Sequence, residues 1–148
     1  MNLESKIQKD LITAMKAKDE KALRAVRAIK SAILIFKTSG TGAELDEDAE
    51  IKMLQKMVKQ RKESLAIFEQ QGRDALAQTE REEIEVIEQY LPQQLSADEI
   101  EATVKNIIEE SGATGMKDMG KVMAAANKAF AGRAEGAVIS GIVKRLLA

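Results

Sequence analysis

The chain has 148 residues, of which 45% are hydrophobic and 32% are charged, and its formal net charge is −1. These proportions are ordinary for a folded protein and exclude a chain that is disordered throughout. Because the chain contains no Cys and no His, disulfides, thiol nucleophiles, imidazole bases and the usual structural zinc sites are excluded as well.

Helical periodicity begins at the N-terminus. Asn2 can cap a first helix, and a second helix follows it closely. Each has apolar residues at spacings of three and four, which we expect to be buried. These two stripes are Leu3, Ile7, Leu11 and Met15, and then Ala22, Val26, Ile29, Ile33 and Phe36. Arg24 and Arg27 point away from the second stripe.

Two further helices are predicted before residue 92. Residues 38–42 are rich in Gly, Ser and Thr and form a loop, after which Asp46 can begin a long third helix that Gly72 can end. Thr79 followed by Glu82 matches a capping box, which predicts that the fourth helix begins there. The stripes expected to be buried are Ile51, Leu54, Val58, Leu65 and Phe68 in the third helix, and Ile84, Ile87 and Leu91 in the fourth.

Pro92, the only proline, disfavours helix at the preceding residue and is followed by a second capping box, Ser96 with Glu99. The capping box predicts a fifth helix to about Ser111. These signals together place a domain boundary near residues 91–96. We therefore expect an N-terminal domain over residues 1–91 and a C-terminal domain over residues 96–148.

Six of the nine glycines lie after Ser111, in a segment that is otherwise strongly helical. Glycine costs about 1 kcal/mol in a helix interior relative to alanine, so we interpret Gly120, Gly132 and Gly136 as caps or close approaches between helices. For Gly136 we expect a close approach. The expected buried stripes are Met119, Val122, Met123, Ala126 and Phe130, and then Val138, Ile142 and Leu146.

These elements predict an all-α fold with two small helical domains, the second of which is a three-helix module. Aromatic residues make up only 3% of the chain, and no alternating apolar pattern with hairpin turns occurs. Both observations argue against a sheet.

Charge is unevenly distributed along the chain. Residues 1–38 contain nine Lys or Arg against four Asp or Glu, residues 39–91 contain seven against thirteen, and residues 92–148 contain seven of each. Any nucleic-acid surface is therefore local. The candidates for phosphate contact are Arg24 and Arg27 in the second helix, and Lys117, Lys121 and Lys128, which we expect on one side of a later helix.

The remaining motifs favour structural interpretations. The spacing of Gly112, Gly115 and Gly120 fits neither a dinucleotide-binding nor a P-loop pattern. Five glutamates, Glu80, Glu82, Glu83, Glu85 and Glu88, could suggest a magnesium site, but they spread around their helix and read as a solvated surface. We expect no metal and no cofactor.

Several segments carry a resemblance to a known family. Tyr90-Leu-Pro-Gln-Gln-Leu-Ser-Ala-Asp-Glu-Ile100, Gly112-Ala-Thr-Gly-Met-Lys-Asp-Met-Gly-Lys-Val-Met123 and Gly132-Arg-Ala-Glu-Gly136 resemble the tail domain of GatB, the tRNA-binding subunit of the glutamine-dependent aminoacyl-tRNA amidotransferase. Phe68-Glu-Gln-Gln-Gly-Arg-Asp-Ala-Leu76 and Glu83-Ile-Glu-Val-Ile-Glu-Gln-Tyr-Leu-Pro92 narrow this to the free-standing YqeY-like proteins, over essentially the whole chain. Glu135 departs from the family pattern, which has Asp, a better helix cap, at that position.

The resemblance implies a non-catalytic protein that contacts tRNA or another structured RNA, or an adaptor. Two alternatives stay open. One is an accessory part of a carbon–nitrogen ligase with glutamine as amide donor, with partners in the aminoacyl-tRNA or amidotransferase machinery. The other is a protein-binding helical module without an RNA role. GatB's catalytic chemistry lies outside its tail domain, and nothing in this sequence matches it, so the chain alone is not expected to be an enzyme.

The sequence also bears on location. The longest uninterrupted apolar run, residues 32–36, is far shorter than the roughly 20 residues that span a bilayer. The first twenty residues contain eight charged side chains and no apolar block of the signal-peptide type. A cytoplasmic protein without a membrane partner is therefore expected.

Overall fold

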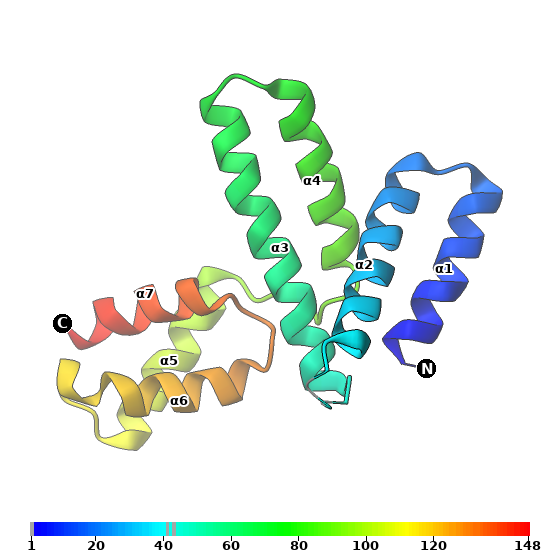
Figure 1. The fold of residues 1–148 in the computed structure, drawn as a ribbon. Coiled ribbons are helices and arrows are strands. Elements are labelled where there is room, and N and C mark those ends of the chain that lie inside the picture. The colour runs from blue at the N-terminus through cyan, green and yellow to red at the C-terminus, as the bar shows by residue number, and fades with distance from the viewer. Residues whose placement is uncertain (1, 41, 43) are drawn as a thin grey trace. The chain divides into compact units, whose positions relative to one another are not determined.

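Seven α-helices and one 3₁₀ helix form in the part of the chain that the computed structural model describes, residues 2–40, 42 and 44–148 (Figure 1). They are α1 (Leu3–Ala17), α2 (Glu20–Thr38), α3 (Glu47–Gln70), α4 (Asp74–Glu88), α5 (Ala97–Ser111), η1 (Met116–Asp118), α6 (Met119–Phe130) and α7 (Gly136–Leu147). No strand occurs among these residues, which confirms the all-α class. The chain divides into two compact units, Met1–Leu91 and Pro92–Ala148.

Local capping chemistry determines where several helices begin. The side chains of Asn2, Asp46 and Ser96 each accept a hydrogen bond from the amide three residues later, at 2.9, 2.8 and 3.2 Å, as predicted. Each bond satisfies one of the backbone donors that a helix leaves unpaired, which stabilises the helix by about 1 kcal/mol. Gly72, at φ +68°, follows the end of α3 as predicted.

The predicted start of α4 is wrong. The helix begins at Asp74, five residues before Thr79, and its N-cap residue Arg73 makes no side-chain capping bond. Ala75, Leu76 and Ala77 are strong helix formers, and Ala77 is fully buried, so packing extends the helix toward its N-terminus. The Thr79 hydroxyl instead donates to the Ala75 carbonyl at 3.2 Å, one turn back along the same helix.

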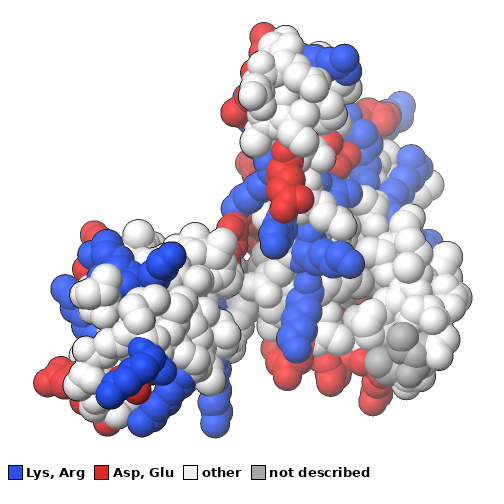
Figure 2. Space-filling view, turned by 60° about the vertical axis from the view of Figure 1, so that its left-hand side comes forward, with Lys and Arg blue, Asp and Glu red and all other residues white. Residues whose placement is uncertain are grey.

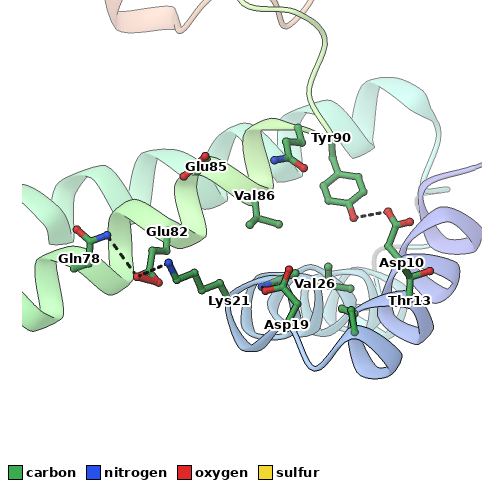
Figure 3. Close-up of a pocket in the computed structure, with 14 residues that line it drawn as sticks. Asp10, Thr13, Asp19, Lys21, Val26, Gln78, Glu82, Glu85, Val86 and Tyr90 are labelled. Carbon is green, nitrogen blue, oxygen red and sulfur yellow. Dashed lines mark hydrogen bonds and ion pairs between the residues drawn. The ribbon is translucent and has the colours of Figure 1, made fainter.

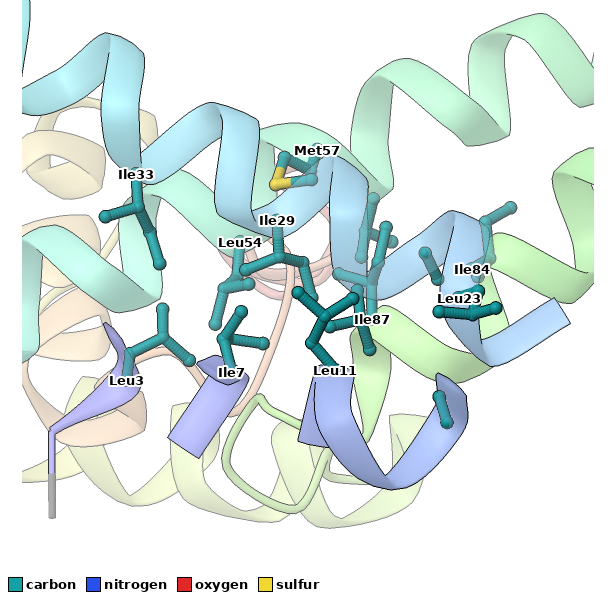
Figure 4. Packing of buried hydrophobic residues seen from close by; sticks show 14 residues of the cluster. Leu3, Ile7, Leu11, Leu23, Ile29, Ile33, Leu54, Met57, Ile84 and Ile87 are labelled. Atoms are coloured by element: carbon teal, nitrogen blue, oxygen red, sulfur yellow. The ribbon is translucent and has the colours of Figure 1, made fainter. Parts of the chain in front are cut away.

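The core of the N-terminal unit lies where α2 packs on both α1 and α4, and α4 packs on α3 (Figure 4). Ile7, Ile29 and Ile87 are at most 1% exposed, and burying such a side chain contributes about 1.5–3 kcal/mol. In the expected stripe of α1, one position differs. Met15 is 53% exposed, and Ala14 is buried in its place.

In the C-terminal unit α5, α6 and α7 pack against one another around a second core. Val122, Ala126 and Phe130 are buried as expected. The predicted stripe of α7 is wrong by one residue. The buried side chains are Ile139, Val143 and Leu147, whereas Val138 is 40% exposed.

Hydrogen bonds close the C-terminal unit at the loop between α6 and α7. The Leu95 amide donates to the Arg133 carbonyl at 2.8 Å, and the Gln94 side-chain amide donates to the Gly132 carbonyl at 3.0 Å. Ala131 and Gly132 both have positive φ, 43° and 83°. The segment after Pro92 and the loop before α7 therefore form one hydrogen-bonded element, which we call the 92–95/131–133 clasp.

The close approach expected at Gly136 is not found. A Cβ added to this glycine would meet no atom within 4 Å, and the residue is exposed at the first position of α7. Gly120 is equally open. The preceding Glu135 makes no side-chain capping bond to α7, which agrees with its being a poorer cap than Asp.

Candidate functional site

Three lysines predicted to contact phosphates lie in the C-terminal unit, and all three are exposed. Lys121 and Lys128 are in α6, seven residues apart, so they lie on one side of that helix. Lys117 belongs to η1 and not to the helix in which it was expected. The lysines therefore line successive elements, η1 and then α6.

Asp118 organises the turn from which these lysines extend. Its carboxylate accepts a hydrogen bond from the Thr114 amide at 2.9 Å, which is the main reason that its pKa lies below the usual value; Lys117 and Lys121 add to this shift. The ammonium of Lys121 donates to the Ser111 carbonyl at 3.2 Å, at the end of α5. Both contacts are exposed, so the lysine charges stay open to solvent.

Charge is segregated between the helices of the C-terminal unit. Residues 97–111, which form α5, contain one Lys against five Asp or Glu, whereas residues 112–148 contain six Lys or Arg against two. Lys and Arg outnumber Asp and Glu on the face of this unit seen at the lower left of Figure 2. The even charge of the whole unit thus hides an excess of Lys and Arg in residues 112–148, of which Arg145 of α7 pairs with Glu101 of α5 at 3.1 Å.

Arg24 and Arg27 belong to the N-terminal unit, so the five predicted residues do not form one cluster. The guanidinium of Arg24 contacts Glu82 at 3.1 Å and Glu83 at 3.9 Å, both in α4. Arg27 makes no ion pair with any residue that the structure describes, and it lines a groove between α1 and α2. Arg24 therefore serves contacts between helices, whereas Arg27 is free to meet a partner.

Three of the five glutamates of α4, Glu82, Glu83 and Glu88, take part in ion pairs, which the sequence interpretation as a solvated surface missed. Glu82 also pairs with Lys21 at 3.7 Å, and Glu83 pairs with Arg61 of α3 at 2.9 Å. The side chains of Glu82 and Glu83 are only 16% exposed. The sequence did contain a signal for these ion pairs. Positive charge is in excess in residues 1–38 and negative charge in residues 39–91, and unlike charges on neighbouring helices attract.

A cleft of about 570 Å³ lies between α1, the start of α2 and the end of α4 (Figure 3). The Tyr90 hydroxyl donates to Asp10 at 2.5 Å across it, and the Lys6 ammonium lies 5.2 Å from the centre of the Tyr90 ring. Burial, reinforced by the bond to Asp10, raises the pKa of Tyr90. These contacts hold the end of α4 on α1.

In the same helix α4, burial raises the pKa of Glu80, with Glu83 adding to the shift and Arg61 opposing it.

Within residues 2–40, 42 and 44–148, no group of three or more Asp or Glu side chains is arranged to hold a metal ion. In the same residues, no helix has both the length and the apolar content to cross a membrane.

Comparison with known proteins gives a consistent family. A family model described as "Yqey-like protein" matches residues 4–147. Three similar proteins are each named "Altered inheritance of mitochondria protein 41, mitochondrial". The one from Lachancea thermotolerans is 37% identical over 70% of this chain and 57% of its own length. The one from Saccharomyces cerevisiae strain YJM789 is 34% identical over 71% and 58%. The one from Clavispora lusitaniae is 40% identical over 59% and 50%.

Two facts follow from these matches. The chain spans less than two thirds of the length of each of these three relatives. The relatives are named as mitochondrial proteins, so the cytoplasmic location expected from the sequence is contradicted.

Proposed function

We propose that this chain, which belongs to the family of YqeY-like proteins, is a non-catalytic protein that contacts structured RNA, with tRNA the first candidate, through the lysines of its C-terminal unit. The observation that carries the proposal is the row of exposed lysines on η1 and α6, with the acidic residues of the same unit concentrated in α5. The resemblance of this unit to the tail domain of GatB supports tRNA as the ligand. For the location, the names of the relatives support a mitochondrial compartment.

The lysines suit recognition of the RNA backbone. Ammonium groups that neutralise phosphates release counterions, and this provides affinity without reading the sequence. Gly120 lies between Lys117 and Lys121 with open space at its missing side chain, so a phosphate can approach the backbone there. Sequence readout usually needs stacking on aromatic rings, and Phe130 of this unit is only 2% exposed. We therefore expect weak binding that depends strongly on salt.

The five residues predicted to contact phosphates have different roles in the proposal. Lys117, Lys121 and Lys128 form the proposed RNA surface. Arg24 is engaged by Glu82 and Glu83, so its guanidinium offers less to a phosphate. Arg27 lies in the other unit and beside an apolar groove, and we leave it out of the RNA surface.

The experiment is a titration of labelled tRNA at two salt concentrations with the parent chain and with Lys117→Glu/Lys121→Glu. The matched control is Lys9→Glu/Lys16→Glu, which makes the same change in charge on exposed positions of α1. Each neutralised phosphate contributes about 0.7–0.9 to the slope of log affinity against log salt, so removing two contacts lowers that slope by about 1.5.

We expect Lys117→Glu/Lys121→Glu to lose tRNA binding while its circular dichroism spectrum stays that of the parent. We expect the control, Lys9→Glu/Lys16→Glu, to bind tRNA like the parent. No detectable binding of the parent at low salt, or equal binding by both double variants, would refute this surface. If Lys117→Glu/Lys121→Glu loses helical content, the titration is repeated with Lys128→Glu. Lys128 makes no hydrogen bond or ion pair with the described residues, so replacing it leaves the packing intact.

A further inference from the structure

A groove on the N-terminal unit, between α1 and α2, has the character of a protein-binding surface. Its volume is about 410 Å³, and Ile7 from α1 and Ile33 from α2 form its floor. Both isoleucines also belong to the core, where they are at most 3% exposed. The groove is therefore a rigid depression whose base is held by the packing of the two helices.

One face of α2 forms a wall of this groove. Arg27, Lys30, Leu34 and Lys37 follow one another at spacings of three, four and three residues, so they lie in a row along the helix. At a rise of 1.5 Å per residue the row is about 15 Å long, which equals about three turns of a helix lying beside it.

Leu34 is the apolar member of the row and is 61% exposed. A large apolar side chain exposed between three cations costs free energy in the isolated chain, because water must order around it, and it is suited to be covered by a partner. It lies directly beside the apolar floor of the groove.

The charges around Leu34 are positive and only partly compensated. Glu4 of α1 accepts a hydrogen bond from Lys37 and neutralises it. Arg27 and Lys30 make no ion pair with the residues that the structure describes. The groove thus combines an apolar floor, an exposed leucine and two unpaired cations on its rim.

We propose that this groove binds an amphipathic helix of another protein, about three turns long, whose apolar stripe covers Leu34 and whose flanking Asp or Glu residues pair with Arg27 and Lys30. Helices that bind in grooves insert side chains at such spacings, and complementary charge on the rim sets their orientation. The proposal is independent of the RNA surface, which lies in the other unit.

The charges and the apolar floor favour this occupant over two others. An RNA would meet Arg27 and Lys30 but would gain nothing from covering Leu34, since the groove has no aromatic lining on which a base could stack. A second copy of the chain joined through the same face would set the cations of the two copies, Arg27, Lys30 and Lys37, against one another, because a two-fold interface pairs the same surface patch of both copies.

The experiment selects displayed peptides of about 16 residues, a length of roughly four helical turns, against the full chain. Enriched peptides are then measured by fluorescence anisotropy against four single variants. Leu34→Asp and Lys30→Glu alter the groove. Ile35→Asp and Lys9→Glu are the matched controls, because Ile35 is 68% exposed on the same helix and Lys9 is exposed on α1, and neither lines the groove.

We expect the enriched peptides to share an apolar stripe at helical spacing flanked by acidic residues. Leu34→Asp and Lys30→Glu should each weaken peptide binding about tenfold or more, because both residues lie at the centre of the proposed interface. The two controls lie outside it and should change the affinity by less than about twofold. Enrichment of peptides without acidic residues, or equal binding by Leu34→Asp and Ile35→Asp, overturns the proposal.

The two other occupants give distinct results. If tRNA binding falls in Lys30→Glu but not in Leu34→Asp, the groove is an RNA contact. If sedimentation shows a dimer of the parent that Leu34→Asp dissociates, the groove joins two copies. Either result overturns the partner-helix proposal. All four substitutions lie on exposed positions, so the fold is retained and each outcome is interpretable.

Discussion

The Leu95 amide donates to the Arg133 carbonyl at 2.8 Å, and the Arg133 side-chain Nε donates to the carbonyl of Gln93 at 3.3 Å. Each segment of the 92–95/131–133 clasp thus provides both a donor and an acceptor. The direction of the Arg133 carbonyl depends on the left-handed backbone of the two residues before it, Ala131 and Gly132. Residues 92–95 lie within the segment 90–100, and Gly132 and Arg133 within the segment 132–136, two of the segments that resemble the tail domain of GatB.

We predict that Gly132→Ala lowers the free energy of unfolding by about 1–2 kcal/mol, the cost of a left-handed backbone for a residue with a Cβ. Gly132 has φ +83°. The control is Gly136→Ala, a helical glycine where an added Cβ meets nothing within 4 Å, and we expect it to be neutral or slightly stabilising. Urea denaturation measures both. Equal effects of the two substitutions would show that the clasp does not require the left-handed residue.

A second prediction concerns the partly buried pair of Arg61 and Glu83, joined at 2.9 Å, whose side chains are 19% and 16% exposed. A double-mutant cycle with Arg61→Ala and Glu83→Ala is expected to give a coupling energy of about 1–3 kcal/mol, because a hydrogen bond between charged groups is shielded from water here. For comparison, the pair of Arg81 and Glu69 is also joined at 2.9 Å but its side chains are 46% and 50% exposed, so it should couple by no more than about 0.5 kcal/mol. Similar coupling in the two cycles would contradict the role of burial.

Tyr90 gives a prediction for alkaline pH. Its pKa is raised in the folded chain, mainly by burial and then by Asp10, whereas in the unfolded chain it returns to the ordinary value of 10.0. Above that pH the unfolded state loses the phenolic proton and the folded state keeps it, so stability falls as pH rises. Near neutral pH, Tyr90→Phe should be less stable by about 1 kcal/mol through the lost hydrogen bond.

The difference between the parent and Tyr90→Phe should shrink above pH 10.0, because only the parent loses this contribution. Lysines titrate in the same range, but they do so in both proteins and cancel in the comparison. Urea denaturation of the two proteins at neutral and alkaline pH is the measurement, and a difference that does not change with pH would disprove the linkage.

The separate cores of the two units lead to a fourth prediction, that a fragment of residues 92–148 folds by itself. Its nine buried residues, among them Phe130, form their own cluster. We expect the fragment to show cooperative thermal unfolding followed by circular dichroism. The substitution Phe130→Ala, which removes the largest side chain of that core, should abolish the transition at a cost of about 3–5 kcal/mol. A fragment without a cooperative transition would show that the unit depends on the rest of the chain.

The sequence predicted best the features that depend on interactions within one turn of a helix. Asn2, Asp46 and Ser96 cap their helices through bonds to amides three residues away. Thr79 has the same capping motif, but the helix start predicted from it is wrong. A threonine inside a helix can donate its hydroxyl hydrogen to the carbonyl four residues earlier, as Thr79 does to Ala75. The motif alone does not show which of the two bonds forms.

The α7 stripe failed for a related reason. Apolar residues occur there in pairs, such as Val138 with Ile139 and Ile142 with Val143, so two stripes one residue apart have the same spacing. Packing against α5 and α6 selects the second stripe. The exposure of Lys117, Lys121 and Lys128 follows from the sequence pattern, whereas the pairing of Arg24 with Glu82 joins residues 58 positions apart and requires the tertiary fold.

The position of Tyr90 has a practical consequence. It is the only tyrosine in a chain without tryptophan, and it lies at the end of the N-terminal unit, bonded to Asp10. Tyrosine emission, excited at a wavelength that phenylalanine does not absorb, therefore reports on the N-terminal unit alone, while far-ultraviolet ellipticity reports on the helices of both units. When the two signals are recorded in one melt, any separation of their midpoints measures how independently the two halves lose structure, with no label attached to the protein.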